Sequence, residues 1–439
     1  MKGLKIGLAF IMTFFLMGGA WAQDQPTRDN RKLFGHNVEG LPPVKLIMCS
    51  DSAFGTLGDV QAYIFERMVK EESKGKIQID HHRFGSLYKS TDWTKVIPMG
   101  TIDMGTINIG YLMTKCPDYA PWVIAYIWNN PEHMFSVSGS PEWYEMQDSL
   151  AAKFWGMKPL SHVAYGNWDY WANVPVKTMK DFRGKRFWSY GELPNAYIIS
   201  WGGSPVILAR AERYMAYYKK TLDGISSSST LYFENKEYEA GKYWLHMPTY
   251  PPGSVGFHYV QLYIGLKKWQ TLPEAYKRII LDAADVYSWN SIWEMLALEK
   301  ASEYQMVHDL GVIDVGISTK NLKEYKVICD TAVEAGRVYA KQKRGVTDAQ
   351  WDAAKAILKK YGDPKITSQY TWWYEAAWAE SDRRVQGALK RIKAGENKAK
   401  VWESYHPKRH YEMPYEKLKE EWLKTPRAVR NWPMDLRLK

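Results

Sequence analysis

Histidine and cysteine are the side chains that most often build metal or nucleophilic sites, and their spacing in this chain suits neither. His81 and His82 are adjacent on an expected strand, so their side chains point to opposite faces and do not share a metal ion. His406 and His410 have a ligand-like spacing, but Pro407 interrupts the helix that would align them, so we expect both to be solvent-exposed. The three cysteines are far apart and odd in number, which argues against a disulfide framework and favours buried thiols.

The sequence motifs of the common enzyme classes are also missing. We find no phosphate-binding glycine loop, no HExxH zinc helix, no nucleophile elbow and no paired-cysteine metal spacing. The net charge of +11 is spread along the chain without a nucleic-acid-binding module beside it. We therefore predict a protein that is not an enzyme, needs no metal or cofactor, and has no nucleic-acid partner.

The N-terminus has the pattern of a secretory signal. Lys2 and Lys5 precede an apolar run over 6–16, and Ala20-Trp21-Ala22 supplies small residues for cleavage before Gln23. We predict a signal peptide over 1–22 and a flexible lead-in over 23–43. The mature chain is then expected to be exported and soluble.

Polar and aromatic residues gather where expected strands end. A buried strand over 44–49 runs into Ser50-Asp51-Ser52, and tryptophan and tyrosine are concentrated between residues 163 and 230. The elements expected around the first stretch are a helix over 58–72, a strand over 76–80, a helix over 91–99, and a strand after Gly100-Thr101-Ile102-Asp103-Met104-Gly105. This alternation predicts a parallel sheet covered by helices, whose ligands lie at the carboxyl ends of the strands.

Long helices are expected in the second half of the chain. One begins near Pro273 and continues to about His308. Thr347-Asp348-Ala349-Gln350 is a capping box that opens another helix, and Gly362 and Pro364 end it. The aromatic content of the remaining chain is too high for disorder. We expect this tail to wrap over the body of the protein or to form a subunit interface.

Several motifs in this order resemble those of the periplasmic solute-binding proteins of tripartite ATP-independent (TRAP) transporters, DctP type. They are Lys74-Gly75-Lys76-Ile77, Phe84-Gly85-Ser86-Leu87, the Gly100–Gly105 turn, Met179-Lys180-Asp181-Phe182-Arg183-Gly184-Lys185, Gly203-Ser204-Pro205-Val206, Leu222-Asp223-Gly224 and Leu266-Lys267-Lys268-Trp269-Gln270-Thr271-Leu272-Pro273. The resemblance spans about residues 44–340. It implies an α/β fold of two lobes, a class II-like periplasmic binding protein with a hinge and a long lobe-spanning helix, to which this chain adds a helical C-terminal extension. We predict lobe one over 44–162 plus 252–287, lobe two over 163–251 plus 288–336, and the extension over 337–439.

The resemblance also indicates where a ligand binds. The family clamps a ligand carboxylate with an arginine, whose planar fork donates two parallel bonds. An ungapped match puts Trp188 at that position, with Arg186 two residues earlier on the same strand, and a second frequent arginine position falls at Trp168. Further expected ligand contacts are Asn108, Tyr111, Asp51, Ser227 and Trp244, with His246 and Tyr250 as weaker candidates.

The function implied is capture of a small organic solute and its delivery to the membrane permease subunits of a TRAP transporter. Organic acids are the family's habitual ligands, whereas tryptophan at the clamp position favours an aromatic, apolar or cationic solute, because a buried carboxylate without a donor is costly. Two alternatives concern partners. The chain could instead be a periplasmic sensor that feeds a two-component receptor, and the extension could form a homodimer.

Overall fold

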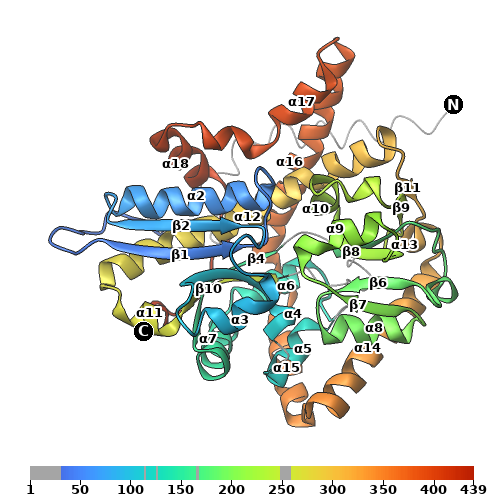
Figure 1. The fold of residues 1–439 in the computed structure, drawn as a ribbon, viewed down its shortest axis with the longest axis horizontal. Coiled ribbons are helices and arrows are strands. Elements are labelled where there is room, and N and C mark those ends of the chain that lie inside the picture. The colour runs from blue at the N-terminus through green and yellow to red at the C-terminus, as the bar shows by residue number, and fades with distance from the viewer. Residues whose placement is uncertain (1–30, 113–114, 125–126, 165–167, 248–258) are drawn as a thin grey trace.

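The computed structural model describes residues 31–112, 115–124, 127–164, 168–247 and 259–439, and contains two mixed β-sheets surrounded by helices (Figure 1). We call the five-stranded sheet with its helices lobe one, and the six-stranded sheet with its helices lobe two. The two-lobe α/β fold expected from the sequence is confirmed. The expected signal peptide and Tyr250 lie outside the described residues.

Lobe one is built on the strand order β2-β1-β3-β10-β4. Strands β1, β2 and β3 are parallel, and β10 runs antiparallel between β3 and β4. The strands are β1 (Val44–Ser50), β2 (Ile77–Arg83), β3 (Met104–Asn108), β4 (Met157–Ala164) and β10 (Tyr259–Gly265). The helices are α2 (Leu57–Glu72), η1 (Ser90–Asp92), α3 (Trp93–Val96), α4 (Ile109–Leu112), η2 (Pro117–Tyr119), α5 (Ala120–Val123), α6 (Pro131–Ser138), α7 (Pro141–Trp155) and α11 (Leu266–Thr271).

The helix expected over 91–99 is shorter than predicted. A 3-10 turn, η1, leads into α3, which ends at Val96. Ile97 still has helical backbone angles, and Pro98 after it has no N–H to continue the hydrogen bonds of the helix.

Lobe two has the strand order β11-β9-β5-β8-β6-β7. Strand β6 is parallel to β7 and to β8, and β5 is antiparallel to β8 and β9. The strands are β5 (Trp168–Ala172), β6 (Arg186–Ser189), β7 (Ser204–Ile207), β8 (Gly224–Ser228), β9 (Tyr243–Trp244) and β11 (Ile313–Asp314). The helices are η3 (Met179–Phe182), α8 (Glu192–Ser200), α9 (Arg210–Tyr218), α10 (Ser229–Glu234), η4 (Glu237–Glu239), α13 (Ile317–Lys320) and α14 (Leu322–Arg344).

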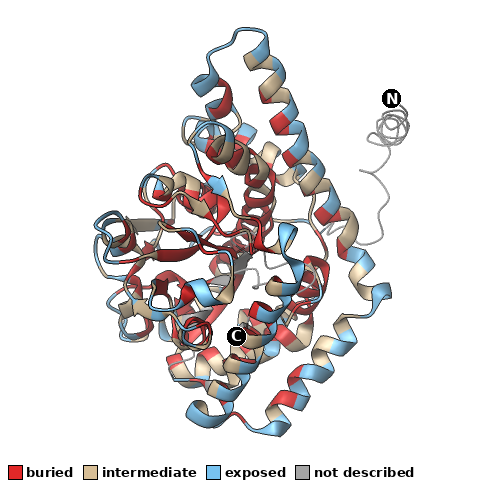
Figure 2. Cartoon of the chain, turned by 90° about the vertical axis from the view of Figure 1, so that its right-hand side faces the viewer, coloured by how far each residue is buried: buried red, intermediate tan, exposed pale blue. Residues whose placement is uncertain are grey.

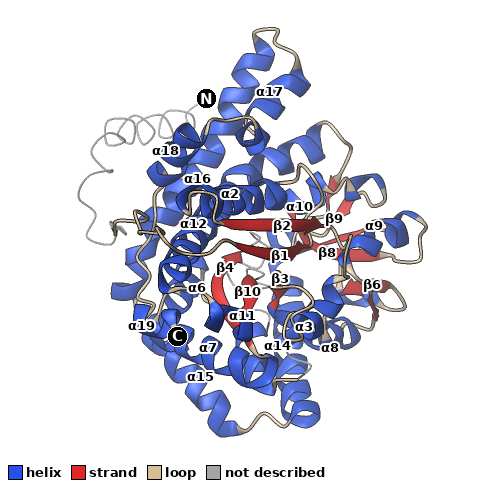
Figure 3. Ribbon diagram, turned by 60° about the vertical axis from the view of Figure 1, so that its left-hand side comes forward, coloured by secondary structure: helices blue, strands red, loops and turns tan. Residues whose placement is uncertain are grey.

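Helix α12 (Glu274–His308) connects the two lobes. Its 35 residues span about 52 Å at 1.5 Å per residue. It packs against α2 and β4 of lobe one and against α10 of lobe two. Most of its residues are buried, and in Figure 3 it lies beside the strands of lobe one.

The C-terminal extension wraps around the same chain. Its helices are α15 (Asp348–Tyr361), α16 (Pro364–Lys393), α17 (Lys398–Ser404), η5 (Pro407–Tyr411), α18 (Tyr415–Lys424) and α19 (Met434–Leu438), and the capping box at Thr347 is present. Helix α15 lies on α5 and α6, α16 runs along α12 and α6, and both η5 and α18 contact α2. The burial pattern agrees, since the outer helices alternate buried and exposed residues (Figure 2). Of the two arrangements expected for the tail, wrapping over the body is the one observed.

Buried charges anchor both ends of the described chain on α12. Arg437 donates two hydrogen bonds to Asp285, at 3.0 and 2.9 Å, and Arg31 donates a third at 3.1 Å. Arg430 lies 3.8 Å from the same carboxylate. The described part of the expected flexible lead-in is therefore packed, because Arg31 and the buried Phe34 both lie against α12.

The predicted exposure of two histidines is wrong, and the predicted burial of the three cysteines is confirmed. His410 is not exposed as predicted: it is 3 % exposed and lies beside Trp422, because the extension folds back over lobe one. His406 is half-buried against Glu234. The thiols of Cys49, Cys116 and Cys329 are buried, as expected.

Candidate functional site

Several polar side chains follow the carboxyl ends of strands in both lobes. Asp51 comes directly after β1 and Tyr111 lies three residues beyond β3 in lobe one. Tyr190 comes directly after β6, and Arg210 begins α9 just beyond β7 in lobe two. Since β1 and β3 are parallel, and β6 and β7 are parallel, each pair of side chains lies at one edge of its sheet.

A direct contact brings these two edges together. The ammonium of Lys89, next to Ser90 in lobe one, lies 2.6 Å from the carboxylate of Glu212 in lobe two. Glu212 stands on the first turn of α9 between Arg210 and Arg213. We call the set Asp51, Ser90, Tyr111, Tyr190 and Arg210 the inter-lobe group.

The electrostatics of Asp51 reflect this position. Burial raises the pKa of its carboxyl to about 6, while the guanidinium groups of Arg210 and Arg213 oppose the rise. Burial also raises the pKa of Tyr111, and the negative charge of Asp51 adds to that effect. A carboxyl group from one lobe thus faces cationic groups from the other.

Aromatic rings border the inter-lobe group on the lobe-two side. Tyr190 lies 5.9 Å from Trp168 in an edge-to-face arrangement and 5.7 Å from Trp188. Burial raises the pKa of Tyr190, with a further contribution from Tyr111 across the junction. Two of the predicted tryptophans are therefore brought together, with a tyrosine that the sequence analysis did not single out between them.

Trp188 also supports a buried ion pair. The guanidinium carbon of Arg213 lies 4.5 Å from the centre of its ring, and its indole N–H donates to the carbonyl of Leu208 at 3.0 Å. Arg213 in turn donates two hydrogen bonds to Glu237, at 2.7 and 2.9 Å. The positive charge of Arg213 is thus neutralised inside lobe two.

Arg186 does not join the inter-lobe group. It begins β6, at the opposite end of the strand from Ser189, and its side chain is 45 % exposed. It donates to both carboxylate oxygens of Asp223, at 3.0 and 3.1 Å, and to the carbonyl of Lys220 at 2.6 Å. A shift of the strand register that would bring it to the clamp position is not observed.

Trp244 lies in a second buried cluster. Its ring stacks on Trp171 at 5.3 Å and on His246 at 4.1 Å, and its N–H donates to Asp169 at 2.7 Å. Burial raises the pKa of Asp169 to about 6. These contacts place Trp244 among the residues that hold lobe two together.

The remaining predicted contacts lie close to strand ends. Asn108 is the last residue of β3, opposite Val260 of β10, and is half-buried. Ser227 is fully buried opposite Asp169, and its hydroxyl has no hydrogen-bond partner among the described residues. Two neighbouring serines have structural roles, since Ser228 caps α10 and Ser229 donates to Glu303 at 2.8 Å.

Sequence reasoning missed Arg210 and Tyr190. The signal for Arg210 is its position shortly after the motif Gly203-Ser204-Pro205-Val206, because that motif forms β7 and Arg210 opens the next helix. The family resemblance placed the ligand-binding arginine on β6 instead, at the position of Trp188.

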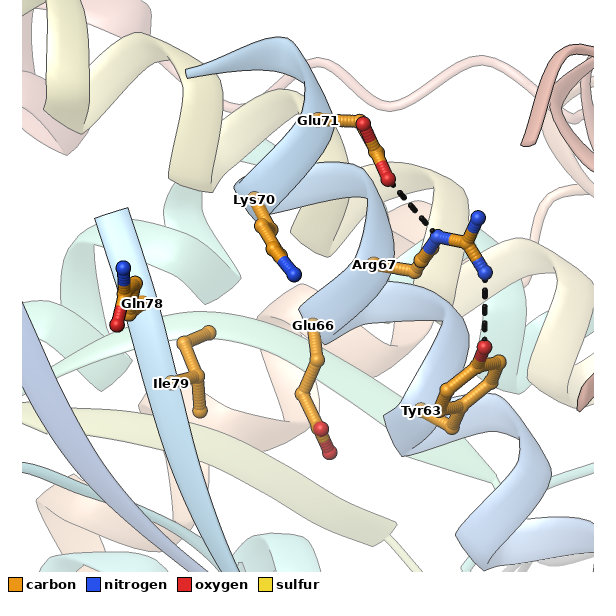
Figure 4. A pocket seen from close by; sticks show the side chains of 7 residues that line it. All are labelled: Tyr63, Glu66, Arg67, Lys70, Glu71, Gln78 and Ile79. Atoms are coloured by element: carbon orange, nitrogen blue, oxygen red, sulfur yellow. Dashed lines mark hydrogen bonds and ion pairs between the residues drawn. The ribbon is translucent and has the colours of Figure 1, made fainter. Parts of the chain in front are cut away.

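A surface groove of about 480 Å³ lies away from this junction, between α2 and β2 (Figure 4). Arg67 within it donates to Glu71 at 3.0 Å and to Tyr63 at 2.9 Å. Arg67 is therefore already engaged by two neighbouring side chains in this groove. Within the described residues no set of three or more His, Cys, Asp or Glu side chains is placed to hold a metal ion, and no helix is long and apolar enough to cross a membrane.

Solved structures share this fold. A TRAP periplasmic solute-binding protein from Shewanella oneidensis with bound succinate is 15 % identical, with a TM-score of 0.64, covering 72 % of this chain and 99 % of its own. One from Roseobacter denitrificans with bound β-D-glucuronate is 18 % identical, with a TM-score of 0.61, covering 71 % of this chain and 99 % of its own. A marine metagenome protein with co-purified pyroglutamate is 18 % identical, with a TM-score of 0.62, covering 73 % of this chain and 99 % of its own.

The model of the bacterial extracellular solute-binding proteins, family 7 (DctP), matches residues 58–350. That match includes both sheets except for β1, and it ends where the helices of the extension begin. The chain therefore belongs to the DctP family of TRAP periplasmic solute-binding proteins.

Proposed function

We propose that this protein captures a small organic acid between its two lobes and delivers it to the permease of a TRAP transporter. Arg210 supplies the positive charge that meets the ligand carboxylate. The observation that carries the proposal is the inter-lobe group, in which Arg210 of lobe two stands opposite Asp51 and Tyr111 of lobe one. Closure of the lobes then brings contacts from both sides onto one solute.

Three further observations support an acidic ligand. The related structures hold succinate, glucuronate and pyroglutamate, all of which carry a carboxylate. Arginine is the side chain best suited to pair with two carboxylate oxygens. Arg186 is bound to Asp223 on the exposed side of its strand, whereas Arg210 acts electrostatically on both Asp51 and Tyr111 at the junction.

A matched pair of variants tests the role of Arg210. A thermal-shift screen of organic acids, aromatic acids, polyols and quaternary amines, together with native mass spectrometry of the purified protein, first identifies a binding solute. Arg210→Met is then expected to weaken its binding at least tenfold in isothermal titration calorimetry, because one charge-assisted contact is lost. Arg186→Met is the control and is expected to leave affinity unchanged. Equal effects of the two variants would contradict the proposal.

The permease subunits and a second copy of this chain remain predicted partners. Delivery to permease subunits is tested by uptake of the identified solute into vesicles that hold the permease, with and without this protein. The homodimer is tested by light scattering of the full chain, which separates a mass near 50 kDa from its double.

A further inference from the structure

Asp51 is an unexpected residue for a site that receives an organic acid. It places a carboxyl group at the junction where the ligand carboxylate is expected, directly after β1 and opposite the first turn of α9. The contact between Lys89 and Glu212 at 2.6 Å fixes the two segments side by side. A plain carboxylic acid would therefore meet a group of its own sign.

The charges around the junction balance before any ligand arrives. Arg213 is cancelled by Glu237 through two hydrogen bonds, and Lys89 is cancelled by Glu212. Arg210 and Asp51 carry opposite charges that attract each other across the same junction. A ligand that brings only a carboxylate leaves one negative charge in excess, which is costly in a site closed from water.

A ligand with both signs of charge removes that excess. An ammonium group next to Asp51 compensates its carboxylate, while a carboxylate next to Arg210 compensates the guanidinium. The rings of Tyr190 and Trp168 supply apolar area for the body of the ligand, since Arg213 already covers a face of Trp188.

We propose that the solute is an amino-bearing carboxylic acid, whose ammonium group is held by Asp51 and whose carboxylate is held by Arg210. This inference rests on the proposed function and names the ligand class within it. Asp51 is then the residue that separates amino acids and their cyclic relatives from the simple organic acids.

Matched probes test the ligand class directly. We would titrate the full-length mature protein with three pairs that differ in the amino group: L-phenylalanine and 3-phenylpropionate, L-leucine and 4-methylpentanoate, and L-proline and cyclopentanecarboxylate. At least one amino acid is expected to bind tenfold or more tightly than its partner. Equal or tighter binding of the plain acids, or no binding by any amino acid, would overturn the inference.

The outcomes also separate this inference from the proposed function. If plain acids bind with Arg210-dependent affinity, the proposed function stands and the amino group is excluded. If no solute of the wider screen binds, both the amino-acid inference and the proposed function fail.

A neutral variant isolates the role of Asp51. Asp51→Asn keeps the shape of the side chain and removes its charge, so it is expected to lower the amino-acid affinity tenfold or more and to leave or improve that of the plain acid. Asp80→Asn is the control, because Asp80 lies on the outer strand β2 and pairs with Lys45 at 2.9 Å. Unchanged selectivity in Asp51→Asn would contradict the assignment even if both proteins fold equally well.

The pH profile gives a second readout with a definite sign. An ammonium ligand favours ionised Asp51, so the affinity is expected to be constant above pH 6 and to fall as the pH drops through about 6. A ligand carboxylate bound to protonated Asp51 would give the opposite slope. The other groups facing Asp51 are Arg210, Arg213 with its partner Glu237, Tyr111 and Cys49. Persistence of the slope in Asp51→Asn would assign it to one of these groups and overturn the inference.

Discussion

The two lobes meet each other and the C-terminal extension in different ways. The ion pair between Lys89 and Glu212 across the lobes joins side chains that are 58 % and 45 % exposed. The ion pair that ties Arg437 of the extension to Asp285 of α12 joins side chains that are 1 % and 3 % exposed. Exposed pairs are weak and open readily, whereas a buried pair cannot lose one partner without a large penalty. The exposed ion pair thus lies at the junction that has to open for solute exchange, and the buried ion pair lies at the junction that has to persist.

One residue takes part in both junctions. Glu234, the last residue of α10 in lobe two, accepts hydrogen bonds from the backbone N–H of Leu57 at 3.0 and 3.1 Å. Leu57 begins α2 in lobe one, where Thr56 gives no side-chain cap, so Glu234 caps this helix from the other lobe. His406 of the extension lies 2.6 Å from the same carboxylate. The extension thus reaches the place where the two lobes contact each other.

The largest expected effect comes from breaking the buried junction. Asp285→Asn keeps the side-chain shape but removes the charge that compensates Arg437, Arg430 and Arg31. We expect a loss of about 3–5 kcal/mol in the free energy of unfolding in urea, because buried cations are left without a counter-charge.

The control for that variant is Asp330→Asn. Asp330 pairs with Lys326 on the exposed face of α14, at 65 % and 69 % exposure, so its loss is expected to cost less than about 0.5 kcal/mol. Similar losses in the two variants would remove the contrast between buried and exposed junctions.

Acid is expected to weaken the same buried junction over a defined range. Burial opposes ionisation of Asp285, but Arg437, Arg31 and Arg430 together lower its pKa to about 2. A depressed pKa stabilises the folded state above the ordinary value and loses that effect as the pH falls through the folded value. The stability difference between the natural chain and Asp285→Asn should be constant from pH 8 to about 5 and shrink by roughly 2 kcal/mol between about pH 4 and 2. A difference that does not change with pH would contradict the account.

A smaller effect is expected where the extension reaches the lobes. Glu234→Gln removes the charge that faces the start of α2 and His406, which should disfavour the closed arrangement by about 1 kcal/mol. Solute affinity should then fall about fivefold, as measured by calorimetry. Glu239→Gln, on the outer face of lobe two, should not change affinity. An effect confined to the melting temperature would limit Glu234 to a structural role.

The sequence predicted the main strands and helices of the fold better than it predicted the residues of the candidate site. The β-α-β alternation predicted the parallel strands of lobe one, and the helix expected from Pro273 to about His308 corresponds to α12. These features depend on local periodicity, which a sequence displays directly. The burial of His410 depends instead on the extension folding back over α2, a contact between segments hundreds of residues apart.

The site shows the same limit. Trp188, Trp168 and Tyr111 were named from the family resemblance and Asp51 from the end of a strand, and all four lie around one junction. Arg186 was named from alternation along β6, but its partner Asp223 comes from a distant turn that alternation does not reveal. Arg210 was missed because its importance arises only when lobe two faces Asp51.

The most direct test of the central claim is a crystal structure of the full-length mature protein with the solute that the binding screen identifies. We predict density for the solute between the lobes, with its carboxylate on Arg210 and an amino group on Asp51. A solute bound elsewhere, in the groove between α2 and β2 or in the cluster around Trp244, would contradict the account.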